Sequence, residues 1–89
     1  MEIKLLSKEG TKLKFEIKGE THTFCNLLRK ELWNDKNVEF AGYNVPHSLT
    51  KEIIFILDAK DPEKALKDAV SRLKDRVKEF DSKFEAIMK

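Results

Sequence analysis

The sequence predicts a two-layer α+β domain in which two helices cover one face of a four-stranded antiparallel sheet, in the order β-β-α-β-β-α. Three observations support this fold class. Residues 12–18 alternate between apolar and charged side chains, which is typical of a half-buried strand. Residues 24–33 and 62–88 instead place apolar side chains three or four positions apart, the spacing of a helix face. With 89 residues, the chain is long enough for one domain, residues 1–89.

The first two strands form a hairpin. Residues 2–7 and 12–18 are joined by Lys8-Glu9-Gly10, and Gly10 supplies the positive φ that a bulged hairpin turn requires. Gly19 ends the second strand. Side chains at alternate positions of a strand share one face of the sheet. We therefore expect Ile3 and Leu5 to share one face of the first strand. In the second strand we expect the side chains of Leu13, Phe15 and Ile17 to face inward.

A helix follows this hairpin. Thr23 is the expected N-cap, because its hydroxyl can accept a hydrogen bond from a backbone N–H group of the first turn. The run Asn34-Asp35-Lys36-Asn37 ends the helix, since Asn and Asp tolerate the left-handed backbone of a helix terminus. Between these limits the apolar positions form one stripe. They are Phe24, Leu27, Leu28, Leu32 and Trp33.

Residues 38–45 and 52–58 are predicted to complete the sheet. Pro46 stops the third strand, because it has no N–H group for the ladder. The fourth strand contains the longest apolar run of the chain, from Ile53 to Leu57, so both of its faces are apolar. An antiparallel strand with one face in water normally alternates. We therefore expect another element to cover its second face, or the sheet to curl.

The last segment carries the clearest start signal, Asp61 as N-cap and Pro62 at the first helical position. A helix from 62 to 88 is about 40 Å long, whereas a compact domain of this length measures roughly 30 Å across. The helix should therefore extend beyond its own domain and need a partner surface. The alternative is a helix that frays or bends after Phe80. The apolar positions of the segment alternate in steps of four and three, which is a heptad seam. We expect this seam to pack on the sheet at its start and on partner helices at its end. It is formed by Leu66, Val70, Leu73, Val77, Phe80, Phe84 and Ile87.

Composition limits the function classes. Lys and Arg number 18 against 16 Asp and Glu, without a basic stripe, which argues against binding held mainly by nucleic-acid phosphates. The longest apolar run is far too short for a membrane span, and the first residues lack the pattern of a secretory signal. One cysteine and no signal fit a cytoplasmic location. A core of this size is marginal on its own, so we expect a partner to supplement it.

Catalytic and metal-binding patterns are weak. A zinc site needs three or four ligands with supporting groups, and the candidates are His22, Cys25 and His47. We expect Cys25 to be a small packing residue, since a His–Cys nucleophile pair would need an exposed thiol and a third orienting group. The sequence lacks the phosphate-loop, metalloprotease and hydrolase motifs. We expect its carboxylates to lie among lysines and arginines on the polar, solvated faces, so we expect no catalytic residue, cofactor or metal.

Two stretches together carry a resemblance to a known family. They are residues 19–29, Gly-Glu-Thr-His-Thr-Phe-Cys-Asn-Leu-Leu-Arg, and residues 38–47, Val-Glu-Phe-Ala-Gly-Tyr-Asn-Val-Pro-His. At this spacing, before a long final helix, they resemble the archaeal RNA polymerase subunit L family. That family is similar to the small assembly subunits of eukaryotic polymerases and to the dimerisation domain of the bacterial α subunit. The matching motif residues are His22, Thr23, Asn26, Arg29, Gly42, Tyr43, Pro46 and His47.

The resemblance implies a noncatalytic subunit that forms a heterodimer with the D subunit of the RNA polymerase, as a platform on which the large catalytic subunits assemble for transcription. In that family the active-site carboxylates and magnesium lie on the large subunits, so direct contact with nucleic acid is not expected. The resemblance also implies that Asn26 and Arg29 shape or dock the first helix. The residues expected to line the contact with the D subunit are Phe24, Leu27, Leu28, Leu32, Val77, Phe80, Phe84 and Ile87.

The sequence departs from the family pattern at two positions, and two other functions are also compatible with it. Cys25 stands where the family often has a smaller residue, and Ser48 where it often has Pro. The chain could instead be a thiol or metal enzyme built on His22 and Cys25. Arg29 and Lys30 could touch phosphate, although a solvated face is favoured. As a second alternative, the chain could be a homodimeric nucleic-acid-binding or protein-interaction module. Such a module would use the lysines of the second strand, Lys12, Lys14 and Lys18.

Overall fold

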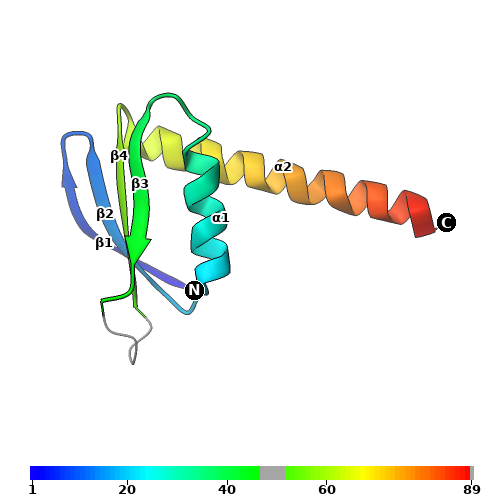
Figure 1. Ribbon diagram of the computed structural model, residues 1–89, viewed down its shortest axis with the longest axis horizontal. Helices are drawn as coiled ribbons and strands as arrows, with labels where there is room; N and C mark the ends of the chain where they lie inside the picture. The colour runs from blue at the N-terminus through cyan, green and yellow to red at the C-terminus, as the bar shows by residue number, and fades with distance from the viewer. Residues whose placement is uncertain (47–51, 89) are drawn as a thin grey trace.

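The computed structural model describes residues 1–46 and 52–88 and has the predicted order of elements, with both helices on one side of the sheet (Figure 1). The predicted fold class is confirmed. The strands are β1 (Glu2–Glu9), β2 (Lys12–Lys18), β3 (Val38–Asn44) and β4 (Ile53–Ala59), and the helices are α1 (His22–Leu32) and α2 (Pro62–Met88).

All strand pairs are antiparallel, and the sheet order is β1-β2-β4-β3. β4 therefore lies between β2 and β3, while β1 and β3 form the two edges of the sheet. The register aligns Phe55 of β4 with Phe15 of β2 and with Tyr43 of β3. The rings of Phe15 and Phe55 stack with centroids 5.2 Å apart, and those of Tyr43 and Phe55 with centroids 6.2 Å apart. One row of aromatic rings thus crosses the sheet beneath the helices.

The core is the layer between the sheet and the helices. The inward positions of β2 and β4 are all buried, and α1 and α2 close the layer from above. Cys25 is fully buried there, so its predicted role as a small packing residue is confirmed. The buried apolar residues are Leu13, Phe15, Ile17, Cys25, Leu28, Leu32, Val38, Ala41, Ile53, Phe55, Leu57, Ala59, Ala65 and Ala69.

The start of α1 differs from the prediction. Thr21, not Thr23, is the N-cap: its backbone is extended, and its hydroxyl accepts a hydrogen bond from the Phe24 N–H group at 3.5 Å. The Thr21 carbonyl also accepts the first helical bond, from Cys25. Two threonines two positions apart have the same capping chemistry, so the sequence alone indicated the wrong one. Thr23 lies exposed in the first turn.

No helix of residues 1–46 and 52–88 lies over the second face of β4, so of the two expected possibilities, a covering element or a curled sheet, this chain does not supply the first. Ile54 and Ile56 are half-buried on this open face of the sheet. The register places Lys14 opposite Ile56, and Glu16 opposite Ile54. The aliphatic stem of a cross-strand lysine shelters an apolar neighbour while its ammonium stays in water. The open face is therefore a partly sheltered, mixed surface.

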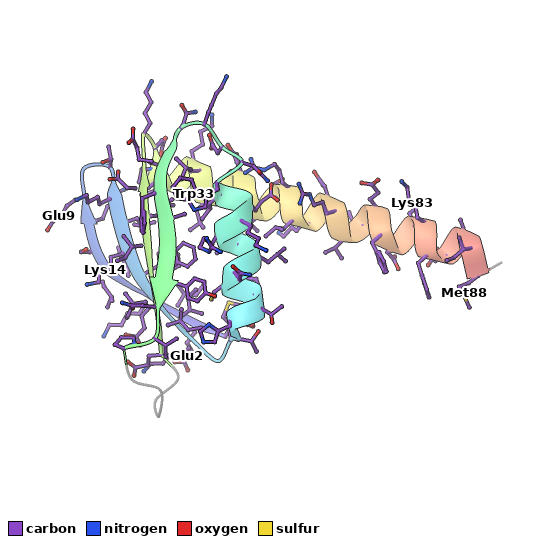
Figure 2. The ribbon with its side chains drawn as sticks, in the orientation of Figure 1. Glu2, Glu9, Lys14, Trp33, Lys83 and Met88 are labelled. Atoms are coloured by element: carbon purple, nitrogen blue, oxygen red, sulfur yellow. The ribbon has the colours of Figure 1, made fainter. Side chains whose placement is uncertain are left out.

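Helix α2 extends well beyond the sheet. Its 27 residues form one unbroken helix, so the alternative of a bend after Phe80 is wrong. The molecule measures 49 × 34 × 16 Å, and its radius of gyration is 14.9 Å, whereas a compact domain of this length has about 12 Å. Figure 2 shows Lys83 and Met88 on the projecting end, far from the sheet. Neither helix of the described residues combines the length and the apolar character that crossing a bilayer requires.

Candidate functional site

The outer half of α2 presents an uncovered apolar stripe. Val77 is 68% exposed, Phe80 69%, Phe84 47% and Ile87 77%. We call these four residues the outer seam. The rings of Phe80 and Phe84 stack against each other with centroids 6.0 Å apart, so the two aromatic side chains form one continuous apolar surface. Large side chains grouped at helical spacing and left in water are typical of a protein interface.

The inner half of α2 packs on its own domain through small side chains. Ala65 and Ala69 are buried, whereas the seam residues Leu66 and Leu73 are only partly buried. Val70 is 37% exposed. The sequence-based expectation that the seam itself packs on the sheet is thus only partly right, because alanines one position away allow the closest approach. The fully buried contact between α2 and the rest of the domain is therefore small in area.

The leucines of α1 divide between two environments. Leu28 and Leu32 are 3% and 0% exposed within the core of the chain, so they are not available to a partner. Leu27 is 48% exposed, and Phe24 is half-buried against the edge of the core. Of the four α1 residues predicted to contact a partner, only Leu27 and Phe24 therefore remain accessible, because the core of the same chain already covers Leu28 and Leu32.

The motif residues His22 and Tyr43 meet in space. The Tyr43 hydroxyl donates to the His22 carbonyl at 3.3 Å and lies 3.4 Å from His22 Nδ1. The two rings are tilted with centroids 5.6 Å apart, and Tyr43 also stacks on Phe55 in the core. The first turn of α1 is thereby attached to β3. This part of the motif has a structural use, which is to hold α1 in place over the sheet.

Two further motif pairs are local. The Arg29 guanidinium donates to the Asn26 side-chain carbonyl at 2.7 Å, one turn back along α1. A Cβ atom on Gly42 would lie 2.8 Å from Cζ of Phe40, so the missing side chain makes room for that ring. Pro46 follows β3 and is exposed. The remaining motif residue, His47, is outside the described residues.

Trp33 fastens the end of α1 to the edge of the sheet. Its indole N–H donates to the Ala41 carbonyl at 3.0 Å, and its ring meets the Phe40 ring edge-on at 6.2 Å. Because β3 is an edge strand, one side of its backbone has no neighbouring strand, and side chains can bond to it. The sequence predicted Trp33 only as a widening of the apolar stripe of α1. The structure places it at the helix terminus instead.

An ion cluster centred on the buried Glu31 joins α1 to α2, and the sequence did not predict it. Glu31 is 2% exposed, and its carboxylate accepts from Arg72 Nε at 2.5 Å and from Arg76 Nη1 at 3.1 Å. Arg72 Nη2 also donates to the Glu31 backbone carbonyl at 3.1 Å. The expectation that every carboxylate lies on a polar face is therefore wrong for Glu31. The spacing along the helix could have indicated this burial, because Glu31 stands seven positions after Phe24 and so lies within the apolar stripe.

This cluster predicts an acid-sensitive part of the stability. The hydrogen bond from Arg72 holds the pKa of the Glu31 carboxyl below its ordinary value of 4.5, against the opposing effect of burial. A depressed folded-state pKa stabilises the fold above the ordinary value, and that contribution is lost as pH falls through the folded-state pKa. Urea unfolding of wild type and Glu31→Gln between pH 7 and pH 2.5 checks this. We expect the stability difference between them to shrink below about pH 4.5; a constant difference would contradict the assignment.

Among the described residues, His22 and Cys25 do not form a thiol or metal site, and the third candidate, His47, lies outside them. Burial raises the pKa of the Cys25 thiol, which disfavours the reactive thiolate. His22 is occupied with Tyr43 through the ring and carbonyl contacts. Over residues 1–46 and 52–88, the structure brings no three His, Cys, Asp or Glu side chains into an arrangement suited to a metal ion. Cys25 therefore contributes to packing and not to nucleophilic catalysis.

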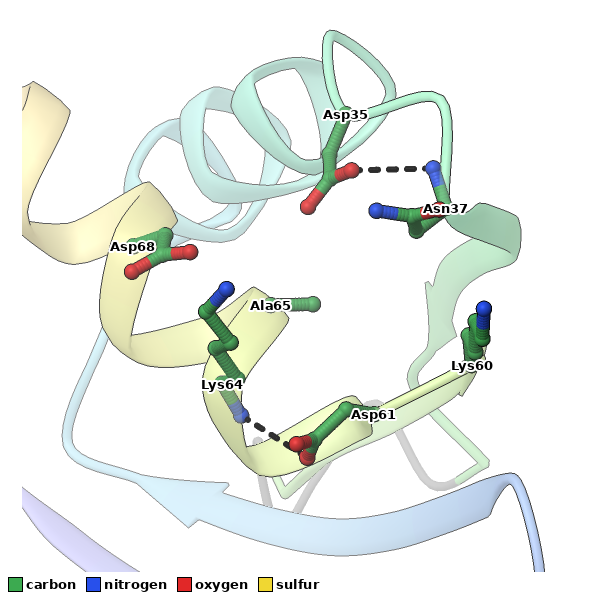
Figure 3. A pocket seen from close by; sticks show the side chains of 7 residues that line it. All are labelled: Asp35, Asn37, Lys60, Asp61, Lys64, Ala65 and Asp68. Carbon is green, nitrogen blue, oxygen red and sulfur yellow. Dashed lines mark hydrogen bonds between the residues drawn. The ribbon is translucent and has the colours of Figure 1, made fainter.

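A shallow depression of about 400 Å³ lies where the loop after α1 meets the start of α2 (Figure 3). Its carboxylates have local structural uses. Asp35 accepts from the Asn37 N–H group at 2.9 Å, and Asp61 caps α2 by accepting from the Lys64 N–H group at 3.3 Å. Both acidic and basic side chains line it, so it has no consistent charge for a ligand. The lining residues are Asp35, Asn37, Lys60, Asp61, Lys64, Ala65 and Asp68.

The lysines of β2 do not form a purely basic surface. Lys18 lies 3.5 Å from Glu16 and 3.7 Å from Glu52, and these carboxylates, Glu16 first, raise the pKa of the Lys18 ammonium. Lys12 and Lys14 are exposed on the same face, where Asp58 is the cross-strand neighbour of Lys12. Binding of nucleic-acid phosphates needs lysines that are not neutralised in this way. The arrangement gives little support to a nucleic-acid-binding module.

Comparisons with known proteins agree with these features. Residues 12–83 match the family described as the RNA polymerase Rpb3/Rpb11 dimerisation domain. DNA-directed RNA polymerase subunit Rpo11 of Thermococcus kodakarensis is 38% identical over 89% of each chain, and that of Methanothermobacter thermautotrophicus is 40% identical over 90% of this chain and 92% of its own.

A solved structure has the same fold. DNA-directed RNA polymerase subunit L from Thermoplasma acidophilum superposes with a TM-score of 0.86, covering 96% of this chain and 86% of its own at 23% identity. The family match spans both motif stretches, the whole of α1 and most of α2. The chain therefore belongs to the RNA polymerase Rpb3/Rpb11 dimerisation-domain family.

Proposed function

We propose that this chain is the small assembly subunit of an archaeal DNA-directed RNA polymerase, subunit L, a family also named Rpo11. It pairs in the cytoplasm with the D subunit of the polymerase to form a heterodimer resembling the bacterial α dimer. That heterodimer is the platform on which the large catalytic subunits assemble for transcription. The chain itself contributes binding surface and no catalytic group.

The outer seam is the observation that carries the proposal. Four large apolar side chains on the projecting part of α2 are between 47% and 77% exposed, and no other part of the described chain lies over them. A subunit interface has a dehydrated apolar centre with a polar rim. The charged side chains on the rest of the projecting helix would form such a rim. A stable partner covering the outer seam therefore accounts for its exposure.

A second uncovered area lies beside the helices. Ile3 and Leu5 of β1 pair with Ile17 and Phe15 of β2, so they face the helix side of the sheet. They nevertheless remain 64% and 58% exposed, because the helices lie mainly over β3 and β4, on the other half of the sheet. We include this area, together with Leu27, in the proposed contact with the D subunit. An obligate interface of this kind resembles a core divided between two chains.

Co-expression with the D subunit of the same organism tests the proposal. We expect an equimolar complex by size-exclusion chromatography with light scattering, whereas the chain alone should self-associate through its exposed apolar surface. Mass spectrometry of the proteins that co-purify with the chain from its native source should identify the D subunit and the large subunits. Separate elution of the two co-expressed chains would refute pairing.

The nucleic-acid alternative has its own outcome in the same set of measurements. Duplex DNA is titrated with the isolated chain at increasing salt. Micromolar binding that weakens steeply as salt rises would support a nucleic-acid-binding module and count against the proposal. We expect no micromolar binding at any of these salt concentrations, since Lys18 is engaged by Glu16 and Glu52.

A further inference from the structure

We infer that Glu31 is a positioning residue: by holding Arg72 and Arg76, it sets the direction in which the outer half of α2 leaves the domain. The inference rests on the proposed pairing function, because direction matters only if a partner must meet the outer seam. It concerns how this chain presents that seam rather than which residues the partner touches.

The apolar support of α2 ends early. The buried residues of the helix are Pro62, Ala65 and Ala69, all in its first third, and Leu73 is the last side chain that packs partly against the core. Every described residue from Lys74 to Met88 is exposed. Contacts through alanine methyl groups are non-directional and small in area. They hold the helix against the sheet but constrain its tilt only weakly.

The ion cluster lies at the outer limit of this support. Arg72 donates two hydrogen bonds to Glu31, one to the carboxylate and one to the backbone carbonyl. Arg76, one turn further out, binds the second carboxylate oxygen. Three charge-assisted bonds from two turns of α2 therefore converge on one residue of α1. Such bonds depend strongly on angle and distance. Unlike the alanine contacts, they fix the crossing of the two helices.

The position of the cluster gives it mechanical leverage. Beyond Arg76, α2 continues for roughly three turns, or about 18 Å. A change in tilt of about 10° at the cluster would move the end of the helix by about 3 Å. Side chains in helix–helix contacts interdigitate at interaxial distances of about 8–10 Å. A displacement of about 3 Å would therefore move Phe84 and Ile87 out of register with the partner side chains between which they pack.

The burial of Glu31 makes a purely stabilising role a poor explanation. A buried ion pair often contributes little net stability compared with a well-packed apolar residue. Arg72 and Arg76 are 38% and 64% exposed, so water can solvate them if the carboxylate is removed. Replacing Glu31 by leucine should therefore preserve the fold while removing the directional bonds. That variant separates the positioning role from stability.

The test measures direction and partner binding separately. Cysteines at the exposed positions Lys14 and Ser82 carry spin labels, and electron–electron resonance gives the distance distribution between the sheet and the outer half of α2 in the full chain. Labelled chain is diluted with unlabelled chain so that only intramolecular distances are read. The native thiol of Cys25 is buried and does not compete for the label. Affinity for the D subunit is measured by calorimetry.

We expect Glu31→Leu to keep its thermal midpoint, to broaden the distance distribution, and to bind the D subunit about tenfold or more weakly. Arg76→Gln, at an exposed position that leaves the core intact, should show the same changes to a smaller degree, and Arg76→Lys should recover part of them. Glu79→Gln is the matched control. It removes an ion pair with Lys83 that lies entirely within α2, at 3.1 Å, so neither readout should change.

The outcomes are separable. Unchanged distances in Arg76→Gln and in a folded Glu31→Leu would overturn the inference, and so would broadened distances with unchanged affinity, because presentation of the seam would then not matter. If Glu31→Leu fails to fold, Arg76→Gln alone decides. If the wild-type chain does not bind the D subunit at all, the proposed function fails, while the distance measurement still reports what the cluster does.

Discussion

Phe84→Asp is expected to weaken pairing with the D subunit by more than about a hundredfold, a loss of about 3–5 kcal/mol. The substitution removes an aromatic side chain from the centre of the outer seam and places an unpaired charge where the partner excludes water. Phe84 is 47% exposed in the chain alone, and its main contact is the stacked Phe80 ring. The free energy of unfolding of the isolated chain should therefore change by only about 0.5 kcal/mol.

Ser82→Asp is the matched control for this experiment. Ser82 is exposed two positions earlier on the same helix, about 160° away from Phe84 around the axis. It receives the same charge at nearly the same distance along α2, so it reports any effect of net charge or of helix propensity. We expect its affinity for the D subunit to stay within about threefold of wild type. Equal losses in both variants would remove the outer seam from the interface.

Leu32→Ala is expected to destabilise the isolated chain by about 2–5 kcal/mol, because Leu32 is fully buried and the rigid sheet beneath it cannot collapse into the cavity. A domain of this size is stable by no more than about 5–15 kcal/mol, so the thermal midpoint should fall by roughly 10 °C or more. Denaturant titration at low protein concentration measures the loss. It tests whether this leucine belongs to the core of the chain.

Leu27→Ala separates the core from the proposed contact on the same helix. It makes the same chemical change five positions earlier, but Leu27 is 48% exposed. The free energy of unfolding should change by no more than about 0.5 kcal/mol, while binding to the D subunit should weaken by about 1 kcal/mol. If Leu27→Ala were as destabilising as Leu32→Ala and left binding unchanged, the division of α1 into two faces would be wrong.

The elements could be predicted where local chemistry was unambiguous. Asp61 followed by Pro62 is a cap and a first-turn residue with few alternatives, and α2 begins where this pair placed it. The alternation in β2 likewise identified its buried face. The start of α1 could not be decided, because Thr21 and Thr23 have the same capping ability and only the docked helix selects one.

The candidate site was predicted in part, for a similar reason. A stripe of leucines shows that one side of α1 is apolar, but it does not show which part the sheet of the same chain covers. Leu28 and Leu32 turned inward and Leu27 outward because α1 packs over β3 at one particular angle. The interior role of Glu31 depends on arginines 41 and 45 positions later, as the ion pairs show. From the sequence, Asp68 was the expected partner of Arg72, because the two stand at the usual four-residue spacing within α2. The pairing of Arg72 with Glu31 could therefore not be predicted.

The central claim is that a partner subunit covers the outer seam, and amide hydrogen exchange tests it most directly. Exchange along α2 is compared between the isolated chain and its complex with the D subunit. We predict rapid exchange from Val77 to Met88 in the isolated chain, where the helix has no tertiary support, and strong protection there in the complex. The open-face segment of β2 around Lys14 should change little. A complex in which residues 77–88 exchange as fast as in the isolated chain would contradict the account.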